Sequence, residues 1–565
     1  MKLKEEVNKV IQTAFQKTGI DAQPINVSEA TKPEFGDYQF NGAMALSKEL
    51  RKNPREIASG ILENLDLSGI VSKAEIAGPG FINLWLNDNV IAEKCREARE
   101  DKRLGVSKKS APIKVVVDYS GPNMAKQMHV GHLRSTIIGD TLSNLLEFLG
   151  DEVIRQNHIG DWGTQFGMLI AYLEERGEDG SGSLKDLEQF YKDAKKRFDE
   201  DEAFADKARE YVVKIQGGDE HCLNLWQKFI DISLGHCEEV YDKLCVRLTR
   251  EDVKAESFYN EDLPEVVADL AEEGRLKESE GAQCVFFEDE EIPVIVQKGD
   301  GGYLYATTDL AALRYRANIL GAKRISYVVD ARQGEHFRQI FKVAKMSGFV
   351  PEDVKLEHVA FGTMMDKGGK PFKTRDGGTV KLIDLLDEAV VKAKAAIKEK
   401  DDYSEEEVER LAKIIGIGAV KYADLSINRE SNYIFNWDKM LSFEGNTSLY
   451  MQYAYARIQS IFRRYRGEIK GSVVITDVLE HRLGVMLLRF EEVLDRAAED
   501  AAPNQITTYL YELVTLFMRF YEQNPILKEG VDEEVKLSRL VLADMTAKTI
   551  KQGLDILGID VVDKL

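Results

Sequence analysis

Apolar residues recur every three to four positions in the first part of the chain, which predicts an N-terminal unit rich in helices. We expect a helix from about Leu3 to Lys17, a second beginning near Tyr38 and a third after Asn53-Pro54. Alternating apolar and polar residues from Ala74 to Leu86 indicate a strand. The polar, basic stretch from Lys102 to Pro112 has the composition of a linker, so residues 1–108 are expected to form a separate domain.

From Ile113 the pattern changes to short apolar runs separated by helical segments. These runs are Lys114–Tyr119, Glu152–Asn157, Tyr303–Thr307, Ile325–Asp330 and Leu356–Phe361. Continuous apolar strands that alternate with helices predict a parallel sheet covered on both faces, as in doubly wound Rossmann-type folds. We expect this domain to span residues 109–385, with a charged, mostly helical insertion at about 165–295.

Beyond residue 385 the pattern is helical throughout. Leucines and aromatic residues at three- and four-residue spacing run from Gln459 to Leu565, with almost no strand signal. Ser404 followed by Glu405 is typical of a helix N-terminus, where acidic side chains interact favourably with the helix dipole. The expected fold class is therefore α/β, with an N-terminal α/β domain, a doubly wound central domain, a helical connecting region over 386–445 and an all-α domain over 446–565.

The composition bears on three properties: a nucleic-acid partner, disulfide bonds and membrane-spanning segments. The 76 basic and 97 acidic residues give a net charge of −21, which by itself disfavours a nucleic-acid partner, although a local basic surface remains compatible with it. The five cysteines are odd in number and never form a C-x-x-C pair, which favours reduced thiols in a cytoplasmic protein. No apolar run approaches the roughly 18 residues of a membrane span.

The most specific chemical signal follows the first strand of the predicted sheet, between Ser120 and Thr136. A strand, a tight turn and a helix N-terminus together form an anion site, because backbone N–H groups and the helix dipole favour phosphate. His129 and His132 lie three residues apart, so both imidazoles can face one bound group. Gly131 between them leaves space for a purine ring. Two surface histidines that merely cap a helix are the alternative interpretation.

The segment Ser120-Gly-Pro-Asn-Met-Ala-Lys-Gln-Met-His-Val-Gly-His-Leu-Arg-Ser-Thr136 resembles the HIGH signature of class I aminoacyl-tRNA synthetases. Its extended form is similar to that of the arginyl-tRNA synthetase family, over nearly the whole chain. The resemblance implies that His129, Gly131 and His132 bind ATP, and that both histidines stabilise charge on the α-phosphate. Its activity would be that of an arginine–tRNA ligase, with tRNA(Arg), L-arginine and ATP as partners and Mg²⁺ accompanying the ATP.

The second class I signature, KMSKS, has two candidate positions. Lys345-Met-Ser-Gly348 matches its first letters, but we interpret it as the end of a helix with Gly348 as C-cap. The glycine-rich, basic loop Gly362–Gly378 follows the last strand and is the better candidate. Matching Phe372-Lys-Thr-Arg375 to the signature assigns catalytic roles to Lys373 and Arg375 and leaves Thr374 in the place of a lysine. Members of the family that share this departure carry a lysine before the first histidine, which here is Lys126.

The resemblance also implies an arginine pocket, in which carboxylates pair with the planar guanidinium. Its residues would be Asp118, Asn123, Tyr305, Asp309 and Gln333, with Gln333 and His336 also on the ATP side. From spacing alone, Tyr305 and Asp309 could equally be a core tyrosine beside a helix-capping aspartate.

Contacts with tRNA are implied for both flanking domains. They would be Phe81 and Asn83 near the N-terminus, and Tyr450, Tyr453, Arg457 and Tyr521 in a DALR-type anticodon-binding domain. Aromatic residues interleaved with arginine suit unstacked bases, but they also suit an ordinary helix core.

Three rival functions stay open at this point: a small H-x-G-H nucleotidylyltransferase, a synthetase for another amino acid, and an RNA-binding protein that has lost catalysis. The His/Cys pairs at 221–222 and 236–237 do not have the spacing of a zinc site, so no structural metal is expected. No heptad repeat favours a dimer, so a monomer is expected.

Overall fold

The computed structural model describes residues 2–19, 26–177, 187–288, 290, 292–372, 380–398 and 403–565. In its N-terminal unit, helices pack on a four-stranded antiparallel sheet of order β1-β2-β4-β3. The elements are α1 (Leu3–Lys17), β1 (Ser28–Glu29), β2 (Tyr38–Phe40), α2 (Gly42–Leu50), α3 (Pro54–Glu63), β3 (Val71–Ala77), β4 (Phe81–Leu86) and α4 (Asp88–Glu100). The predicted first and third helices are confirmed. The second predicted helix is confirmed as α2, but it begins at Gly42 and not near Tyr38, because Tyr38 starts a buried strand that pairs with β4.

The central sheet contains four parallel strands in the order β11-β10-β5-β6. They are β5 (Lys114–Asp118), β6 (Glu152–Gln156), β10 (Arg324–Tyr327) and β11 (Lys355–His358). Helix α5 (Val130–Leu149) connects β5 to β6, and α12 (Gly334–Met346) connects β10 to β11 in the opposite direction. The strand order therefore reverses between β5 and β10, and at such a switch point a crevice opens beyond the carboxyl ends of the strands.

Both faces of this sheet are covered, as predicted. Val115 and Val117 pack in one core with the buried leucines of α5, which include Leu142, Leu145, Leu146 and Leu149. Val116, on the other face, packs in a second core with α12 and with α11 (Tyr305–Arg314). This alternation along β5 is the two-residue period of a strand, and it confirms the doubly wound arrangement.

The insertion between β6 and β10 is helical up to residue 272 and then becomes a small antiparallel sheet. Its elements are α6 (Thr164–Glu175), α7 (Leu187–Glu200), α8 (Glu202–Gln216), α9 (Glu220–Leu244), α10 (Leu263–Glu272), β7 (Leu276–Ser279), β8 (Ala282–Val285) and β9 (Val294–Gln297). The sequence did not predict these three strands. The predicted strand Tyr303–Thr307 is also wrong: Leu304 is the extended N-cap residue of α11, which begins at Tyr305.

The described part of the remaining chain contains helices and one short parallel strand pair, β12 (Met364–Met365) and β13 (Tyr433–Ile434). The helices are α13 (Leu382–Lys398), α14 (Glu405–Leu425), α15 (Trp437–Met440), α16 (Ser448–Tyr465), α17 (Val478–Leu488), α18 (Phe490–Glu499), α19 (Asn504–Gln523) and α20 (Glu533–Ile556). Ser404 caps α14 through a reciprocal capping box with Glu407, which confirms the helix start predicted there.

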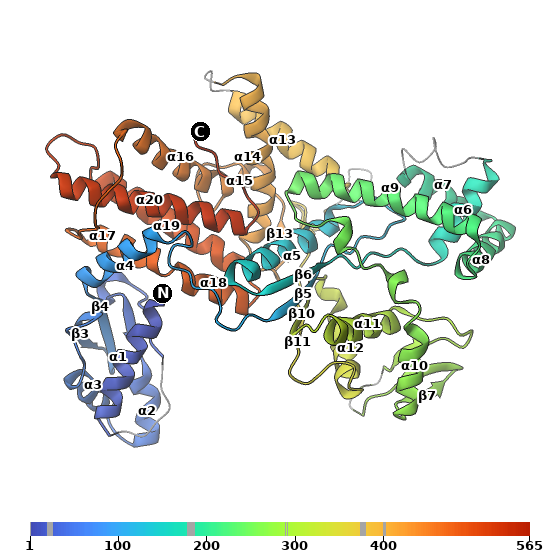
Figure 1. The fold of residues 1–565 in the computed structure, drawn as a ribbon, viewed down its shortest axis with the longest axis horizontal. Helices are drawn as coiled ribbons and strands as arrows, with labels where there is room; N and C mark the ends of the chain where they lie inside the picture. The colour runs from blue at the N-terminus through green and yellow to red at the C-terminus, as the bar shows by residue number, and fades with distance from the viewer. Residues whose placement is uncertain are drawn as a thin grey trace.

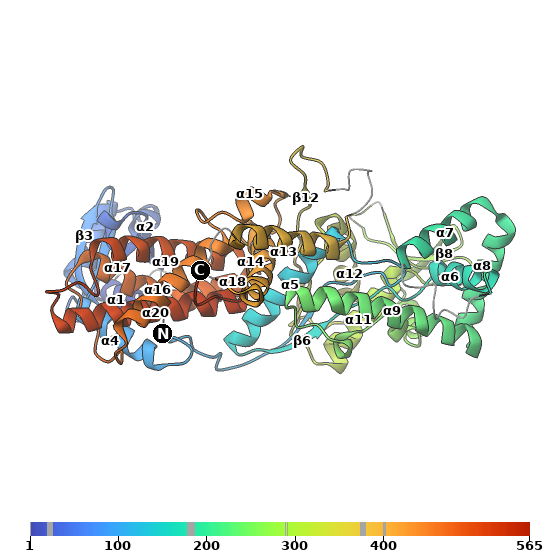
Figure 2. The same ribbon diagram turned by 90° about the horizontal axis from the view of Figure 1, so that it is seen from above.

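Figures 1 and 2 show an elongated molecule with the C-terminal helices at one end and the helices of the insertion at the other. The N-terminal unit lies against the C-terminal helices. Both ring nitrogens of His481 in α17 hydrogen-bond carboxylates of that unit, Asp37 at 3.0 Å and Asp88 at 2.5 Å. All five cysteines are free thiols. Over the described ranges, no helix has the length and apolar character needed to cross a membrane.

Candidate active site at the carboxyl ends of the parallel strands

The turn that follows β5 has an unusual backbone conformation. Ser120 and Gly121 both have positive φ, 72° and 51°, which is costly for a serine. Side chains from three other elements hold the turn in place. The Ser135 hydroxyl accepts the Ser120 N–H (2.9 Å), and Asn157 accepts the Gly121 N–H (3.0 Å). The Ser120 hydroxyl itself bonds the buried hydroxyl of Tyr241 (2.7 Å), so the path of the chain into α5 is strongly determined.

The two histidines of the predicted anion site form a reciprocal cap at the N-terminus of α5. His129 Nδ1 accepts the Gly131 N–H, and His132 Nδ1 accepts the His129 N–H, both at 3.0 Å. A ring nitrogen that accepts a hydrogen bond carries no proton, so each neutral ring has its proton on Nε2. The ring centroids are 4.1 Å apart, and no described residue accepts from either Nε2–H. Two donors are thus available to one ligand.

Electrostatics keeps these rings neutral. Burial, assisted by the neighbouring His129, lowers the pKa of His132 from its usual value of 6.5 to about 3. Burial and the nearby ammonium group of Lys126 also lower the pKa of His129. Lys126 is exposed, with its nitrogen 4.7 Å from the centre of the Tyr191 ring. Positive charge beside the histidines therefore comes from this lysine and not from the imidazoles.

The structure explains why residue 131 is a glycine, which the sequence did not reveal. A Cβ atom at this position would lie 2.7 Å from Cε1 and 2.9 Å from Nδ1 of the His129 ring. A side chain here would force the ring away from the N–H group that it caps. The glycine therefore protects the position of His129, in addition to any space that it leaves for a nucleotide.

The basic loop that we matched to the second signature begins and ends beside α5. At its start, the carbonyl of Gly362 accepts a hydrogen bond from Arg134 on α5 (2.7 Å). After it, the Val380 carbonyl accepts the Val130 N–H (3.1 Å), next to the histidine pair. Lys373, Thr374 and Arg375 themselves lie outside the described residues. The flanking contacts still bring both ends of the loop to the helix that carries the histidines.

The rejected candidate, Lys345-Met-Ser-Gly348, has the structural role predicted for it. It ends α12, and Gly348 has a φ of 63°, in the left-handed region typical of a residue just after a helix. The Lys345 ammonium group donates to three backbone carbonyls, those of Pro351, Glu352 and Val354, at 2.5–3.0 Å. It is thus committed to holding the turn before β11.

Acidic side chains gather beside the N-terminus of α11, and we name this group the acidic pocket. Asp309 is mostly buried and bonds His336 Nε2 at 2.6 Å, which places His336 against the predicted arginine site. Tyr305, one turn earlier, is 70% exposed, so its ring is available to a ligand rather than part of the core. Gln333 is exposed at the end of the short helix Ala331–Gln333, directly before α12.

A carboxylate that sequence reasoning missed completes this pocket. Glu256 begins the short 3₁₀ helix Glu256–Tyr259, and its N–H is held by the Ile159 carbonyl (3.1 Å). Burial and the neighbouring carboxylates Asp161 and Asp309 raise the pKa of Glu256 to about 8. Asp161 is buried and bonded to Ser257, so Glu256 and Asp309 are the two neighbouring carboxyl groups that favour a cationic ligand. No local motif marks Glu256, because only the fold brings the insertion to α11.

Asp118, expected to bind the substrate directly, already has a partner within the protein. Its Oδ2 accepts from Arg316 Nη2 at 2.8 Å, and Arg316 is fully buried. Asn123 lies one turn further along the chain, where its backbone bridges to Gly160 just past the end of β6. The structure therefore brings Asp118 and Asn123 to the same edge of the sheet as the histidines, with an unpredicted arginine between them and the core.

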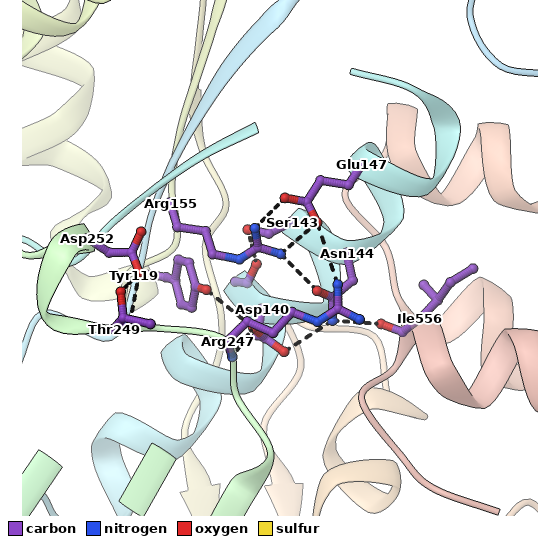
Figure 3. A network of polar contacts seen from close by, with 11 residues as sticks. Tyr119, Asp140, Ser143, Asn144, Glu147, Arg155, Arg247, Thr249, Asp252 and Ile556 are labelled. Carbon is purple, nitrogen blue, oxygen red and sulfur yellow. Dashed lines mark hydrogen bonds and ion pairs between the residues drawn. The ribbon is translucent and has the colours of Figure 1, made fainter. Parts of the chain in front are cut away.

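The second half of α5 carries a polar network that ties the active-site helix to the rest of the molecule (Figure 3). Asp140 accepts from the Tyr119 hydroxyl (3.3 Å) and from the Arg247 N–H (3.0 Å). Asn144 donates to Asp140 (3.2 Å) and to the carbonyl of Ile556 at the end of α20 (3.4 Å). The helix is thereby fixed to the residue after β5, to the segment that follows α9 within the insertion and to the C-terminal helices.

The residues expected to contact RNA differ in how accessible they are in the structure. Asn83 is only 4% exposed and accepts from the Gln39 side chain (2.7 Å), whereas Phe81 at the start of β4 is half-buried. On the C-terminal domain, Arg457 donates to the Tyr453 hydroxyl (2.9 Å), and its guanidinium lies 5.1 Å from the centre of the Tyr521 ring. Tyr450 packs near Tyr511 on the same side of α16. This aromatic and arginine cluster is accessible, while Asn83 is largely covered.

No group of three or more metal-ligating side chains occurs among the residues that the structure describes. What the crevice offers instead is a set of N–H donors, a basic loop and an acidic pocket. That arrangement suits one ligand with phosphate groups and a second with a positively charged end.

Comparison with known proteins agrees with this geometry. Three family descriptions match the chain: "Arginyl tRNA synthetase N terminal domain" over residues 1–86, "tRNA synthetases class I (R), catalytic domain" over 96–437, and "DALR anticodon binding domain" over 451–565. The chain is 54% identical to the arginine–tRNA ligase of Alteromonas mediterranea over 564 residues, which are 98% of each chain. It covers 99% of the solved arginyl-tRNA synthetase of Plasmodium falciparum, with a TM-score of 0.88 and 31% identity. The Thermus thermophilus enzyme shares the fold over its whole length, with a TM-score of 0.84 at 24% identity.

Proposed function

Because the chain belongs to the arginyl-tRNA synthetase family of class I aminoacyl-tRNA synthetases, we propose how the steps of its reaction are divided among the residues described above. The enzyme is an arginine–tRNA ligase, with ATP as a substrate. In the first step the arginine carboxylate attacks the α-phosphate of ATP, and the bond to pyrophosphate breaks. In the second, a ribose hydroxyl of the terminal adenosine of tRNA(Arg) attacks the arginyl carbonyl, loses its proton and releases AMP.

The acidic pocket binds the side chain of the amino acid. The guanidinium pairs with Asp309 and with Glu256, which loses its proton when the cation binds, and lies beside the exposed ring of Tyr305, since a planar cation can combine bidentate carboxylate contacts with stacking. The α-ammonium group faces the carboxyl ends of the strands, where Asp118 and Asn123 bind it. Gln333 closes the pocket on the side of α12.

The N-terminus of α5 binds the phosphates. The Nε2–H groups of His129 and His132 donate to the α-phosphate as its charge develops, which is catalysis by donors that are already oriented. Lys126, Lys373 and Arg375 contribute positive charge around the pyrophosphate, and Gly131 and His336 lie on the nucleotide side. Mg²⁺ enters with the ATP substrate, whose phosphate oxygens are ligands that Mg²⁺ prefers.

The flanking units bind tRNA. Tyr450, Tyr453, Arg457 and Tyr521 present rings and a guanidinium on which splayed anticodon bases can stack. Phe81 is the accessible contact of the N-terminal unit, and Asn83 requires Gln39 to move before it can bond a base.

We assign domain boundaries at residues 108, 385 and 445, a monomeric state and a cytoplasmic location. Limited proteolysis tests the boundaries, sedimentation tests the oligomeric state, and cell fractionation tests the location.

One observation carries this assignment. At the N-terminus of α5 two neutral imidazoles keep their Nε2–H groups available, and beside α11 the carboxyl groups of Glu256 and Asp309 lie close enough for the charge of Asp309 to raise the pKa of Glu256. Donors at one end suit a phosphate, and carboxylates at the other suit a guanidinium. A nucleotidylyltransferase for a neutral substrate has no use for the second feature, and an RNA-binding protein without catalysis has no use for the first.

The test is ATP–pyrophosphate exchange by the full chain, with total tRNA present and absent, using arginine, lysine and citrulline. Citrulline has almost the shape of arginine without its charge, so it isolates the contribution of the carboxylates. We expect exchange with arginine alone. Glu256→Gln should raise the KM for arginine by roughly 10–100-fold, the loss expected for a charge-assisted hydrogen bond, and leave the KM for ATP unchanged.

The matched control is Glu261→Gln, an exposed glutamate five residues further along the same segment. It should change neither KM. Equal use of citrulline and arginine, or an unchanged KM for arginine in Glu256→Gln, would overturn the pocket assignment. Exchange with no amino acid, from protein that is folded and binds tRNA, would favour a binding protein without catalysis.

A further inference from the structure

Arg316 is a buried charged residue that neither motif contains. Its side chain is 0% exposed and reaches the carboxyl ends of two neighbouring strands. Nη2 donates to Asp118 at the end of β5 (2.8 Å), and Nε donates to Gln156 at the end of β6 (2.6 Å). Asp118 and Gln156 are themselves register partners in the sheet. One guanidinium therefore connects the two strand ends that form the floor of the crevice.

The backbone that carries Arg316 is specialised as well. Directly after α11 the helix widens into a π-helical segment, Tyr315–Ile319, in which Arg316 is the second residue. Such widened turns are rare and concentrate at functional sites. The same helix carries Tyr305 and Asp309 of the proposed pocket at its other end. A single element thus presents substrate-binding groups at its start and a buried guanidinium at its end.

Arg316 uses two of its guanidinium nitrogens in these contacts, and the Tyr259 hydroxyl also lies close enough to interact with the guanidinium. Arg316 Nη1 has no hydrogen-bond partner within the described ranges, and the same is true of the buried hydroxyls of Tyr259 and Tyr327. Arg316 lies beside Tyr327, with its guanidinium carbon 4.8 Å from the ring centre. Buried polar groups without partners cost stability. One nitrogen of Arg134 and one of Arg155 also lack a partner, so what distinguishes Arg316 is the pair of strand ends that it joins.

The contact with Arg316 sets the orientation of the Asp118 carboxylate. This carboxylate is buried to 6% exposure, and Arg316 bonds only Oδ2, so that Oδ1 accepts from no described residue. The contact fixes the rotation of the carboxylate and balances part of its charge. Without the arginine, a buried carboxylate would be both mobile and costly.

We propose that Arg316 is a positioning residue for arginine binding: by clamping Asp118 to Gln156, it orients the one Asp118 oxygen that binds the α-ammonium group of the substrate. This inference rests on the role proposed for Asp118. Arg316 touches neither substrate, so its effect passes through Asp118. A lysine cannot replace it, because an ammonium group lacks the planar fork that bonds two strand ends at once.

The test compares Arg316→Lys with Arg324→Lys in ATP–pyrophosphate exchange by the full chain with tRNA present. Arg324 is the matched control: it is 7% exposed and bonds Glu357 (2.6 Å), but it sits at the amino end of β10. Arg316→Lys should raise the KM for arginine by about tenfold or more, with kcat changed less than about threefold and the KM for ATP unchanged. Arg324→Lys should lower the melting temperature and leave both KM values alone.

Asp118→Asn separates failure of this inference from failure of the proposed function. If Arg316 acts through Asp118, adding Arg316→Lys to Asp118→Asn should raise the KM for arginine no further. The inference would be overturned, and the role of Asp118 would stand, if Arg316→Lys behaves like Arg324→Lys or if the effects in the double variant multiply. An unchanged KM for arginine in Asp118→Asn would overturn the role of Asp118, and with it the inference.

Discussion

Helix α5 carries two groups of polar side chains, and they differ in how many of their hydrogen-bonding atoms the protein itself uses. At its N-terminus, His129 and His132 each use Nδ1 for the cap and keep Nε2–H available. In its second half, Asp140 accepts from three different residues, and Asn144 contacts both Asp140 and α20 (Figure 3). Atoms left available mark a site for a ligand, whereas saturated atoms mark a joint between domains.

The difference predicts that substitutions in one helix will separate into two phenotypes. Changes at the first turn should alter rates and leave folding intact. Changes in the second half should alter stability and leave the rate of the folded fraction intact. Each prediction below tests one side of this comparison, beginning with the largest effect.

His132→Asn should slow adenylate formation by about 10²–10³-fold, the typical loss for one oriented donor at a developing charge. The asparagine oxygen can take the place of Nδ1 and accept the His129 N–H, so the helix cap and the stability should be retained. Single-turnover formation of arginyl-adenylate measures the rate, and urea denaturation measures the stability. A normal rate would exclude His132 from catalysis, and a slow rate caused by unfolding would show that the first turn is also a structural joint.

Asp140→Asn should lower the free energy of unfolding by about 2 kcal/mol, because the amide nitrogen cannot accept where a carboxylate oxygen did. Burial lowers the pKa of the Lys421 ammonium group, and the charge of Asp140 opposes this effect. The substitution would also remove this negative charge from beside Lys421. Denaturation followed by circular dichroism gives the stability. The rate of adenylate formation per folded molecule should change less than about threefold; a loss as large as that of His132→Asn would end the distinction between the two halves of α5.

The sequence was informative about α5 because everything that defines its start is local. The strand, the turn, the two histidines and the leucine face all lie between Lys114 and Leu149, so periodicity and motif were sufficient. The same reasoning failed at Tyr303–Thr307, where a five-residue apolar run fits a strand and the first turn of a buried helix equally well. It placed the start of the second helix four residues early, because Tyr38–Phe40 is a strand too short to be recognised beside α2.

The pocket was less predictable because its residues come from distant segments. Glu256 lies in the charged insertion and Arg316 at the end of α11, and no spacing rule relates either to Asp118. Asn83 shows the converse difficulty, since a residue matched to an RNA-contacting segment is covered by Gln39. Burial of a particular polar atom depends on the whole fold and cannot be read from the neighbouring sequence.

Two glycines of α5 allow a matched comparison. A Cβ at Gly131 would meet only the His129 ring, at 2.7 Å, whereas a Cβ at Gly139 would meet the buried Tyr119 side chain at 2.2 Å. Gly131→Ala should therefore reduce the rate of adenylate formation by roughly tenfold by displacing one donor, with little loss of stability. Gly139→Ala should lower the free energy of unfolding by about 1–3 kcal/mol through overpacking, with a near-normal rate. The reverse pattern would contradict the assignment of the two ends.

The smallest effect concerns pH and compares His132 with His481. His132 accepts a hydrogen bond and is neutral, with its pKa lowered to about 3, whereas both nitrogens of His481 donate to carboxylates. Burial alone would lower the pKa of His481, but the hydrogen bonds and charges of Asp37 and Asp88 outweigh it and raise the pKa to about 8.

The two histidines should therefore change stability in opposite directions. A raised folded-state pKa gives His481 a stabilising effect that is complete below pH 6.5 and lost as the pH rises through about 8. The lowered pKa of His132 leaves stability complete above pH 6.5 and reduces it as the pH falls toward 3. Melting temperatures at pH 6 and pH 9 should show His481→Asn about 1–2 °C further below the parent chain at pH 6 than at pH 9.

The melting temperature of His132→Asn should rise relative to that of the parent chain between pH 7 and pH 5, because the folded variant has no ring that resists protonation. Parallel curves for either variant would mean that its ring has the same proton affinity in the folded and unfolded chains, which would contradict the hydrogen-bond pattern from which both protonation states were assigned.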